Sequence, residues 1–217
     1  MPKPFTIAIL PDTQIYVQSY PHIFTSQTQW IVDNKNKHNI KFVLHEGDIT
    51  EHNSELQWVR ASESMSVLDG KVPYAIVIGN HDMGPGGHTE NRESPLFNKH
   101  FPVRKYKPSS TFGGTFEPEL MDNSYHLFET DDMGWLVLAL EYLPRDHVLE
   151  WANDITALHQ DRKTILLTHS HLEMPGQLNA INPLKPPGFG IVSSPEGVND
   201  GVNTWNKLAR KHAGMSF

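Results

Sequence analysis

The chain has 217 residues, 38% of them hydrophobic, which is enough to bury the core of one domain and fits one domain better than two. Its 18 Lys and Arg against 25 Asp and Glu give a formal net charge of -7, which does not indicate a nucleic-acid-binding surface. Cysteine is absent, which excludes disulfide bonds and thiolate metal sites. Because no stretch resembles a signal sequence or a membrane span, we expect no membrane partner and, by default, a cytoplasmic protein. The oligomeric state is not indicated.

The N-terminal part alternates short apolar runs with longer stretches in which apolar residues recur at helical intervals. A continuous apolar run of five or six residues is typical of a buried strand in a parallel sheet. The expected strands are residues 5–10, 41–45 and 74–78, and the expected helices are residues 22–38 and 54–68. This repeated βαβ order predicts an α/β fold with a parallel sheet.

The second half begins with a stretch rich in Gly, Pro and Ser that has no sustained period. We expect an irregular insertion there, at about residues 83–123, which lies over the sheet edge and shapes a substrate pocket. The elements expected after it are strands at residues 124–129, 134–140 and 163–168, helices at residues 144–159 and 203–211, and a loop at residues 172–202. We therefore expect residues 1–217 to form a single domain.

Four polar clusters each follow one of the expected strands directly. They are Asp12-Thr13-Gln14, Gly47-Asp48-Ile49-Thr50-Glu51, Gly79-Asn80-His81-Asp82 and Thr168-His169-Ser170-His171. In an open α/β sheet the carboxyl ends of the strands converge on one crevice, so we expect these clusters to be neighbours. Each cluster alone would be an ordinary turn, but their joint order favours a site. Oxygen donors and imidazole without sulfur are typical ligands of Mn, Fe or Zn.

The order of these clusters resembles the calcineurin-like metallophosphoesterase superfamily. Its motifs are D-x-H, G-D-x-x-[DE], G-N-H-[DE], a lone His after a strand, and G-H-x-H, and the segment Gly79-Asn80-His81-Asp82 is the most specific match. The segment Asp12-Thr13-Gln14 is similar to a bacterial subgroup that has Gln in the first motif. The resemblance implies an αββα sandwich and a metal-dependent hydrolase of phosphate esters, either a phosphatase or a phosphodiesterase.

The resemblance also implies a ligand set for two transition-metal ions, divalent or of mixed valence. Asp12 would bind the first ion, Asp48 would bridge both, and Asn80 and His169 would bind the second. Gln14 replaces the usual histidine, and its amide oxygen is either a weak ligand of the first ion or no ligand. Such an ion pair clamps a phosphate and activates water for in-line attack.

Other residues receive roles beside the metal ions. By the resemblance, His81 stabilises or protonates the leaving oxygen, with Glu51 as the first candidate to orient it and Asp82 as the second. His171 lies two residues after His169 and, in an extended chain, faces the other way, so it contacts substrate or only forms the pocket wall. We expect the other histidines near the motifs to be ordinary polar residues; these are His45, His52 and His88.

The last family motif, G-H-x-H, does not occur before Phe217. We expect that the C-terminal strands are missing by truncation, with a degenerate family member as the other explanation, and that residues 1–217 alone hydrolyse phosphate esters poorly or not at all. Two alternatives to an active enzyme follow. One is an inactive or regulatory module that binds metal or phosphate, and the other is a structural fragment without a site.

Overall fold

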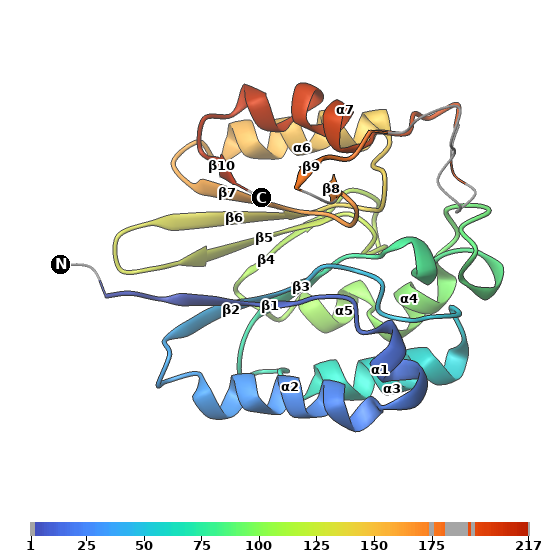
Figure 1. Cartoon of the computed structure of the whole chain (residues 1–217). Coiled ribbons are helices and arrows are strands. Elements are labelled where there is room, and N and C mark those ends of the chain that lie inside the picture. The colour runs from blue at the N-terminus through green and yellow to red at the C-terminus, as the bar shows by residue number, and fades with distance from the viewer. Residues whose placement is uncertain (1–2, 174–175, 181–190, 192–193, 217) are drawn as a thin grey trace.

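The structure is a computed structural model that describes residues 3–173, 176–180, 191 and 194–216. Two β-sheets pack face to face, and helices cover both outer faces (Figure 1). The predicted α/β class, with two sheets flanked by helices, is therefore confirmed.

The first sheet contains the three parallel strands that the N-terminal pattern predicts. Its strands, in the order β1-β2-β3, are β1 (Thr6–Leu10), β2 (Ile40–His45) and β3 (Tyr74–Ile76). The helices on its outer face are α1 (Gln14–Ser19), α2 (Pro21–Asn34) and α3 (Glu55–Ser66) (Figure 1). Phe24 of α2 and Trp58 of α3 are fully buried against Val43 and Ile76 of the sheet. This burial stabilises the helices, because each presents one apolar stripe to the sheet.

The second sheet is mixed and has the strand order β10-β7-β6-β5-β4. Its strands are β4 (Phe112–Thr115), β5 (Ser124–Glu129), β6 (Gly134–Ala139), β7 (Lys163–Leu167) and β10 (Met215–Ser216). The antiparallel pair β5–β6 and the parallel pair β6–β7 are continuous in register. Two helices, α6 (Asp146–Leu158) and α7 (Gly201–Lys207), lie on the outer face (Figure 1).

The interior between the sheets is apolar. Phe42 and Val77 of the first half pack against Val137, Ile165 and Phe128 of the second sheet. The rings of Phe42 and Phe128 are stacked with centroids 4.9 Å apart. Strands β2, β3, β6 and β7 are mostly buried and consist mainly of apolar residues, which made them recognisable in the sequence, whereas β5 also carries Ser124 and His126.

Several short elements differ from the expected loops. The stretch expected to be an irregular insertion contains α4 (Pro95–His100), α5 (Val103–Tyr106), β4 and the 3-10 turn η2 (Pro85–Gly87), and the 3-10 turn η1 (Asn80–Asp82) lies just before it. The expected loop at residues 172–202 contains the hairpin β8 (Leu172–Glu173) and β9 (Gln177–Leu178), while its residues 181–190 lie outside the described part. The last expected helix is divided into α7 and the 3-10 turn η3 (Ala209–Lys211). Elements of two to seven residues are too short to give a clear periodic signal.

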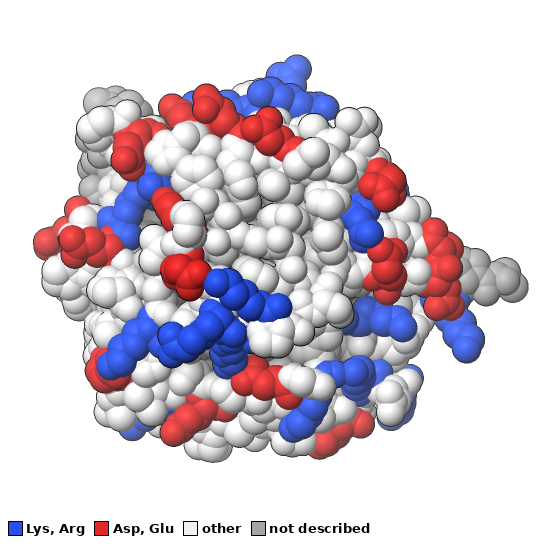
Figure 2. All heavy atoms as spheres, turned by 180° about the vertical axis from the view of Figure 1, so that it is seen from behind, with Lys and Arg blue, Asp and Glu red and all other residues white. Residues whose placement is uncertain are grey.

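The face behind the view of Figure 1 has a mixed charge. Lys and Arg side chains gather in places there, but Asp and Glu side chains lie beside them (Figure 2). Opposite charges at short range reduce the field that either sign projects into solvent. None of the helices in the described residues is long and apolar enough to span a membrane.

A buried histidine between the sheets makes stability depend on pH. His126 of β5 is 1% exposed, and its ring lies between those of Phe42 and Phe112, with centroids 5.9 and 5.7 Å away. Burial lowers the pKa of His126 from 6.5 to about 3. Between these two pH values the unfolded chain binds a proton at His126 and the folded chain does not, so stability must fall as the pH falls below 6.5.

We expect His126→Gln to reduce the loss of stability in acid. One histidine that stays neutral in the fold contributes at most about 1.4 kcal/mol per pH unit to this loss. Urea unfolding of the wild type and the variant at several pH values from 7 to 4.5 measures the two slopes. The exposed His88 provides the control, since His88→Gln makes the same change of side chain outside the core and should alter the slope less than His126→Gln does. Equal slopes for His126→Gln and the wild type would contradict the prediction.

Candidate metal centre

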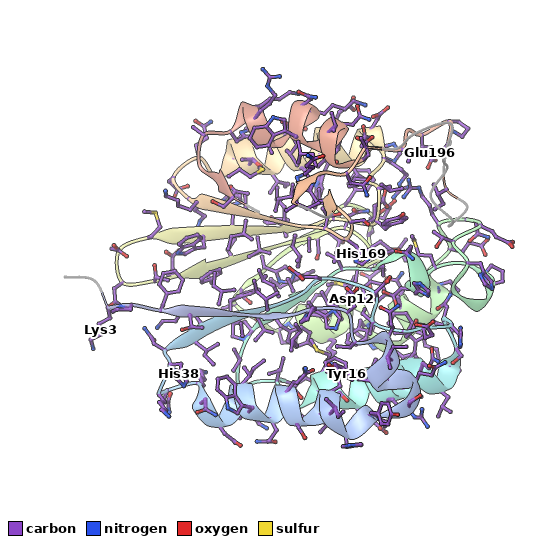
Figure 3. The ribbon with its side chains drawn as sticks, viewed as in Figure 1. Lys3, Asp12, Tyr16, His38, His169 and Glu196 are labelled. Atoms are coloured by element: carbon purple, nitrogen blue, oxygen red, sulfur yellow. The ribbon has the colours of Figure 1, made fainter. Side chains whose placement is uncertain are left out.

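The polar clusters of the sequence meet at one end of the sandwich. Asp12 follows β1, Asp48 follows β2, Asn80 follows β3 and His169 follows β7. Figure 3 shows Asp12 and His169, which come from different sheets, at the same end of the molecule. The convergence follows from topology, because β1, β2 and β3 run parallel and therefore end on the same side.

His169 brings three of these side chains together. Its Nδ1 lies 2.9 Å from the backbone carbonyl of Glu46, and since a carbonyl only accepts, Nδ1 carries a proton. The other ring nitrogen, Nε2, is 3.1 Å from Oδ1 of Asn80 and 3.5 Å from Oδ1 of Asp48. A histidine whose Nδ1 is held by a carbonyl presents Nε2 in the way that metal-binding histidines do.

Asp48 is held in place by the backbone around it. It is 5% exposed, has a φ of 47°, and its Oδ1 accepts a hydrogen bond of 3.0 Å from the N–H of His81. A Cβ at Gly79 would overlap both the carboxylate and the backbone nitrogen of Asp48. Only glycine at position 79 therefore allows the loop after β3 to approach Asp48 this closely.

Carboxylates concentrate negative charge beside this cluster. Partial desolvation raises the pKa of Asp12, the charge of Asp48 adds to the rise, and His169 opposes it. Desolvation also raises the pKa of Glu46, with Asp12 as the next cause. Crowded carboxylates of this kind attract a cation. Sequence reasoning gave Glu46 no role, although it stands directly after β2 like the other site residues.

These residues fit a metal ion by their chemistry. Within the described part of the chain, no group of three or more His, Cys, Asp or Glu side chains is arranged to hold one. The observed cluster instead mixes the amide of Asn80 with the carboxylate of Asp48 and the imidazole of His169. Converging oxygen and nitrogen lone pairs beside carboxylates suit a borderline divalent ion. Gln14 is the first residue of α1 and is half-buried.

His81 lies next to Asp48 and is oriented through the backbone. Its Nδ1 is 3.0 Å from the carbonyl oxygen of Glu51, so Nδ1 donates to that oxygen. The side-chain oxygen Oε2 of Glu51 is buried and makes no hydrogen bond. The observed contact between Glu51 and His81 thus uses the main chain of Glu51.

Asp82 ties two of the site loops together. It is fully buried, and its oxygens accept hydrogen bonds from the N–H groups of Ile49 (3.0 Å), Thr50 (2.8 Å) and Gly79 (2.9 Å) and from the hydroxyl of Thr50 (3.0 Å). Burial raises the pKa of Asp82, the charge of Asp48 adds to the rise, and the backbone donors oppose it. With these donors on both oxygens, Asp82 fixes the loop after β2 against the loop after β3.

His171 lies in the turn before β8 and is 9% exposed. Its backbone carbonyl accepts a hydrogen bond of 2.9 Å from the N–H of Asn179. Burial lowers the pKa of the His171 ring, and the charge of Asp200 opposes that change.

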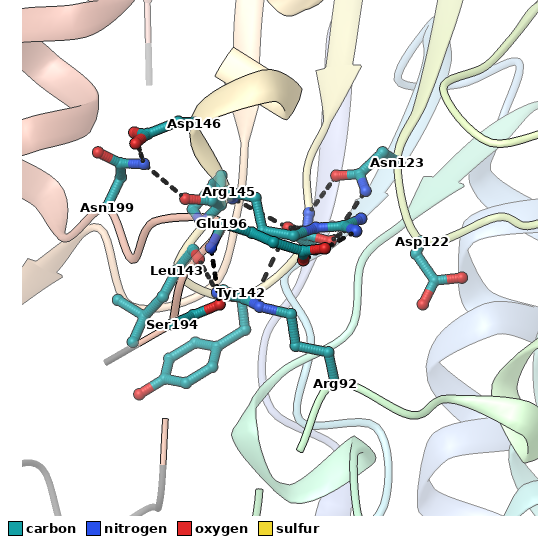
Figure 4. Close-up of polar contacts among 12 residues, drawn as sticks. Arg92, Asp122, Asn123, Tyr142, Leu143, Arg145, Asp146, Ser194, Glu196 and Asn199 are labelled. Atoms are coloured by element: carbon teal, nitrogen blue, oxygen red, sulfur yellow. Dashed lines mark hydrogen bonds and ion pairs between the residues drawn. The ribbon is translucent and has the colours of Figure 1, made fainter. Parts of the chain in front are cut away.

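One aromatic residue beside the centre was missed by sequence reasoning. The ring of Tyr142 packs against that of His169, with centroids 5.8 Å apart. Two arginines hold the loop that carries it (Figure 4): Arg92 donates to the carbonyls of Tyr142 (2.9 Å) and Leu143 (2.7 Å), and Arg145 pairs with the buried Glu141 at 2.8 Å. Tyr142 could have been predicted as a site residue from its position shortly after the buried strand β6.

The comparisons with known proteins agree with this architecture. The profile of the family described as calcineurin-like phosphoesterase (Metallophos) matches residues 5–200. The uncharacterized protein YvnB of Bacillus subtilis (strain 168) is 35% identical over 179 residues, which are 82% of this chain and 13% of YvnB. The chain therefore belongs to the calcineurin-like phosphoesterase family, and it spans 13% of the length of this relative.

A solved structure agrees at the level of the fold. The purple acid phosphatase PPD1 from yellow lupin (Lupinus luteus) seeds is similar with a TM-score of 0.52 and 16% sequence identity, over 94% of this chain and 36% of that chain. The family consists of metallophosphoesterase hydrolases, which typically use a dinuclear metal site and act on phosphoesters.

Proposed function

We propose that this chain hydrolyses phosphate esters, as a phosphatase or a phosphodiesterase, at a centre of two Mn, Fe or Zn ions. The proposed ligands are Asp12, Asp48, Asn80 and His169, with Gln14 as a weak additional ligand of the first ion. The observation that carries the proposal is the approach of His169 Nε2 to Asn80 Oδ1 (3.1 Å) and Asp48 Oδ1 (3.5 Å). Family membership supports it.

The bound ions would supply charge stabilisation for the phosphoryl group and a more acidic water. The residues of the chain would hold and protonate the reactants. Asp48 would contribute the negative charge needed between two cations, and its fixed backbone supports that role. His81 would give a proton to the leaving oxygen, with the Glu51 carbonyl keeping its ring in place and Asp82 acting through the loops. His171 would form part of the substrate-binding wall.

Metal removal and replacement tests the proposal. The folded protein is treated with a chelator, and hydrolysis of p-nitrophenyl phosphate and bis(p-nitrophenyl) phosphate is measured before and after adding Mn²⁺, Zn²⁺ or Fe²⁺. We expect hydrolysis to disappear with the metal and to return with it, at a content of about two ions per chain. Circular dichroism before and after chelation confirms that the protein stays folded.

The two substrates and the metal content together separate the proposal from its alternative. Metal or phosphate binding without turnover of either ester would favour an inactive or regulatory binding module. Failure of the folded protein to bind any of the three ions would contradict the proposed function, and failure to bind phosphate as well would contradict the alternative.

A further inference from the structure

A chain of directed hydrogen bonds runs beneath the candidate centre. The N–H of Gly47 donates to Nδ1 of His45 (3.3 Å), and Nε2 of His45 lies 3.1 Å from the hydroxyl of Thr13. Because Nδ1 accepts, the ring proton is on Nε2, which donates to Thr13. The Thr13 hydroxyl then donates to the carbonyl of Ile49 (3.3 Å). Each step therefore has one donor and one acceptor.

This hydrogen-bond chain is sealed from solvent. Thr13 is 1% exposed, and His45 and Ile49 are fully buried. Burial lowers the pKa of His45 to about 3, so the ring is neutral near neutral pH, as the bonding pattern requires. A buried donor or acceptor that loses its partner in such a place is destabilising, and this opposes sliding of one loop along the other.

The bonds join the loop that carries Asp12 to the loop that carries Asp48. Thr13 lies between Asp12 and Gln14, and its N–H donates to the carbonyl of Asp48 at 3.1 Å. Nearby, the N–H of Glu46 donates to the carbonyl of Leu10 at 3.0 Å. The two loops are thus connected through side chains and main chain together.

The Thr13 hydroxyl is directed away from the helix that it precedes. Thr13 is the N-cap residue of α1, where a threonine hydroxyl usually accepts from the first turn of the helix. Here it makes no capping hydrogen bond and is directed to His45 and Ile49 instead. The hydroxyl is therefore used between loops and not for the helix that it precedes.

We propose that Thr13 and His45 are positioning residues of the candidate metal centre, which set the separation of the Asp12 loop from the Asp48 loop. This inference rests on the proposed function. Asp12 and Asp48 carry like charges and repel each other, so loops that hold them close need a rigid connection. Neither Thr13 nor His45 is assigned a contact with substrate.

Three variants test the positioning role. Thr13→Val keeps the shape and removes the hydroxyl, while Thr13→Ser keeps the hydroxyl. Thr28 on α2 is a matched control, because it is also fully buried and its hydroxyl donates to the carbonyls of Ser64 (2.8 Å) and Thr25 (3.0 Å). Affinity for Mn²⁺ is measured by calorimetry on chelator-treated, folded protein, and urea unfolding is measured in parallel.

We expect Thr13→Val to weaken Mn²⁺ binding by about 10–100-fold, the usual effect of removing support behind a ligand. Thr13→Ser and Thr28→Val should bind within a few-fold of wild type, although Thr28→Val also lowers resistance to urea. If Thr13→Val does not fold, Thr13→Ala removes the same hydroxyl with less bulk against His45 and gives the same comparison.

The outcomes separate this inference from the proposed function. Unchanged Mn²⁺ affinity in the hydroxyl-deleted variant, or equal weakening in Thr28→Val, would overturn the positioning role while leaving the metal centre intact. A wild-type protein that binds no Mn²⁺, Zn²⁺ or Fe²⁺ would overturn the proposed function, and the positioning role with it.

Discussion

Asp48→Asn is expected to remove most of the metal content of the protein and to lower phosphoester hydrolysis by about 10³-fold or more. Asparagine keeps the volume of Asp48, but it brings a neutral amide where two cations would share an anion. A catalytic metal ion supplies several kcal/mol of charge stabilisation, and each 1.4 kcal/mol corresponds to about a tenfold change in rate. Metal content after gel filtration and turnover of bis(p-nitrophenyl) phosphate measure the two effects.

An exposed aspartate on α6 serves as the control for this substitution. Asp154→Asn removes the same charge at a solvent-exposed position and should change neither metal content nor turnover. Asp48 accepts a hydrogen bond from the N–H of His81, and a change in this hydrogen bond can disturb the local backbone. Folding of both variants is therefore compared by circular dichroism. Full metal content in folded Asp48→Asn would show that Asp48 is not the bridging ligand.

His81→Ala is expected to lower the turnover rate by about 10²–10⁴-fold, the usual contribution of a positioned general acid. Metal content should stay at the wild-type level, because His81 contacts the proposed ligand Asp48 through its backbone N–H, which alanine retains. The Glu51 carbonyl holds the His81 ring at Nδ1. Alanine removes this ring and leaves the backbone in place, so the fall in turnover would come from loss of the imidazole. Steady-state kinetics and metal analysis of the same preparation separate the two quantities.

His88→Ala is the matched control for His81→Ala, because His88 is a nearby histidine in the same segment that is exposed to solvent. A substrate with a better leaving group gives a second test. Since such a leaving group needs less protonation, the defect of His81→Ala should shrink with it. Parallel loss of metal and activity in His81→Ala would instead assign His81 to the ligand set.

The order of secondary structure was determined by local sequence. Strands β1, β2, β3 and β7 are short apolar runs that stop at polar residues, and each has the expected position to within about two residues. These runs are readable because β2, β3 and β7 are mostly buried and so show little polar alternation. The four polar clusters could be found because each directly follows one of these apolar runs. The family resemblance depends on the order of the clusters.

The contacts within the site were decided only by the tertiary structure. The sequence named Glu51 as the first candidate to orient His81 and Asp82 as the second, but it gave no atoms for either contact. The structure shows the Glu51 carbonyl beside Nδ1 of His81, and Asp82 accepting hydrogen bonds from the loop backbones. Sequence spacing places residues along a strand or loop, but it does not say whether a side chain or a carbonyl meets a distant ring.

The hydrogen bond between Thr13 and His45 was also not visible in the sequence. His45 was expected to be an ordinary polar residue, and Thr13 has the residue type and place of a helix cap. Their hydrogen bond joins positions 32 residues apart, which no local pattern encodes. The sequence by itself thus determined which strands form and which polar groups end them. Only the tertiary structure decided which of those groups lie next to one another, because the packing of one loop on another depends on contacts between distant parts of the chain.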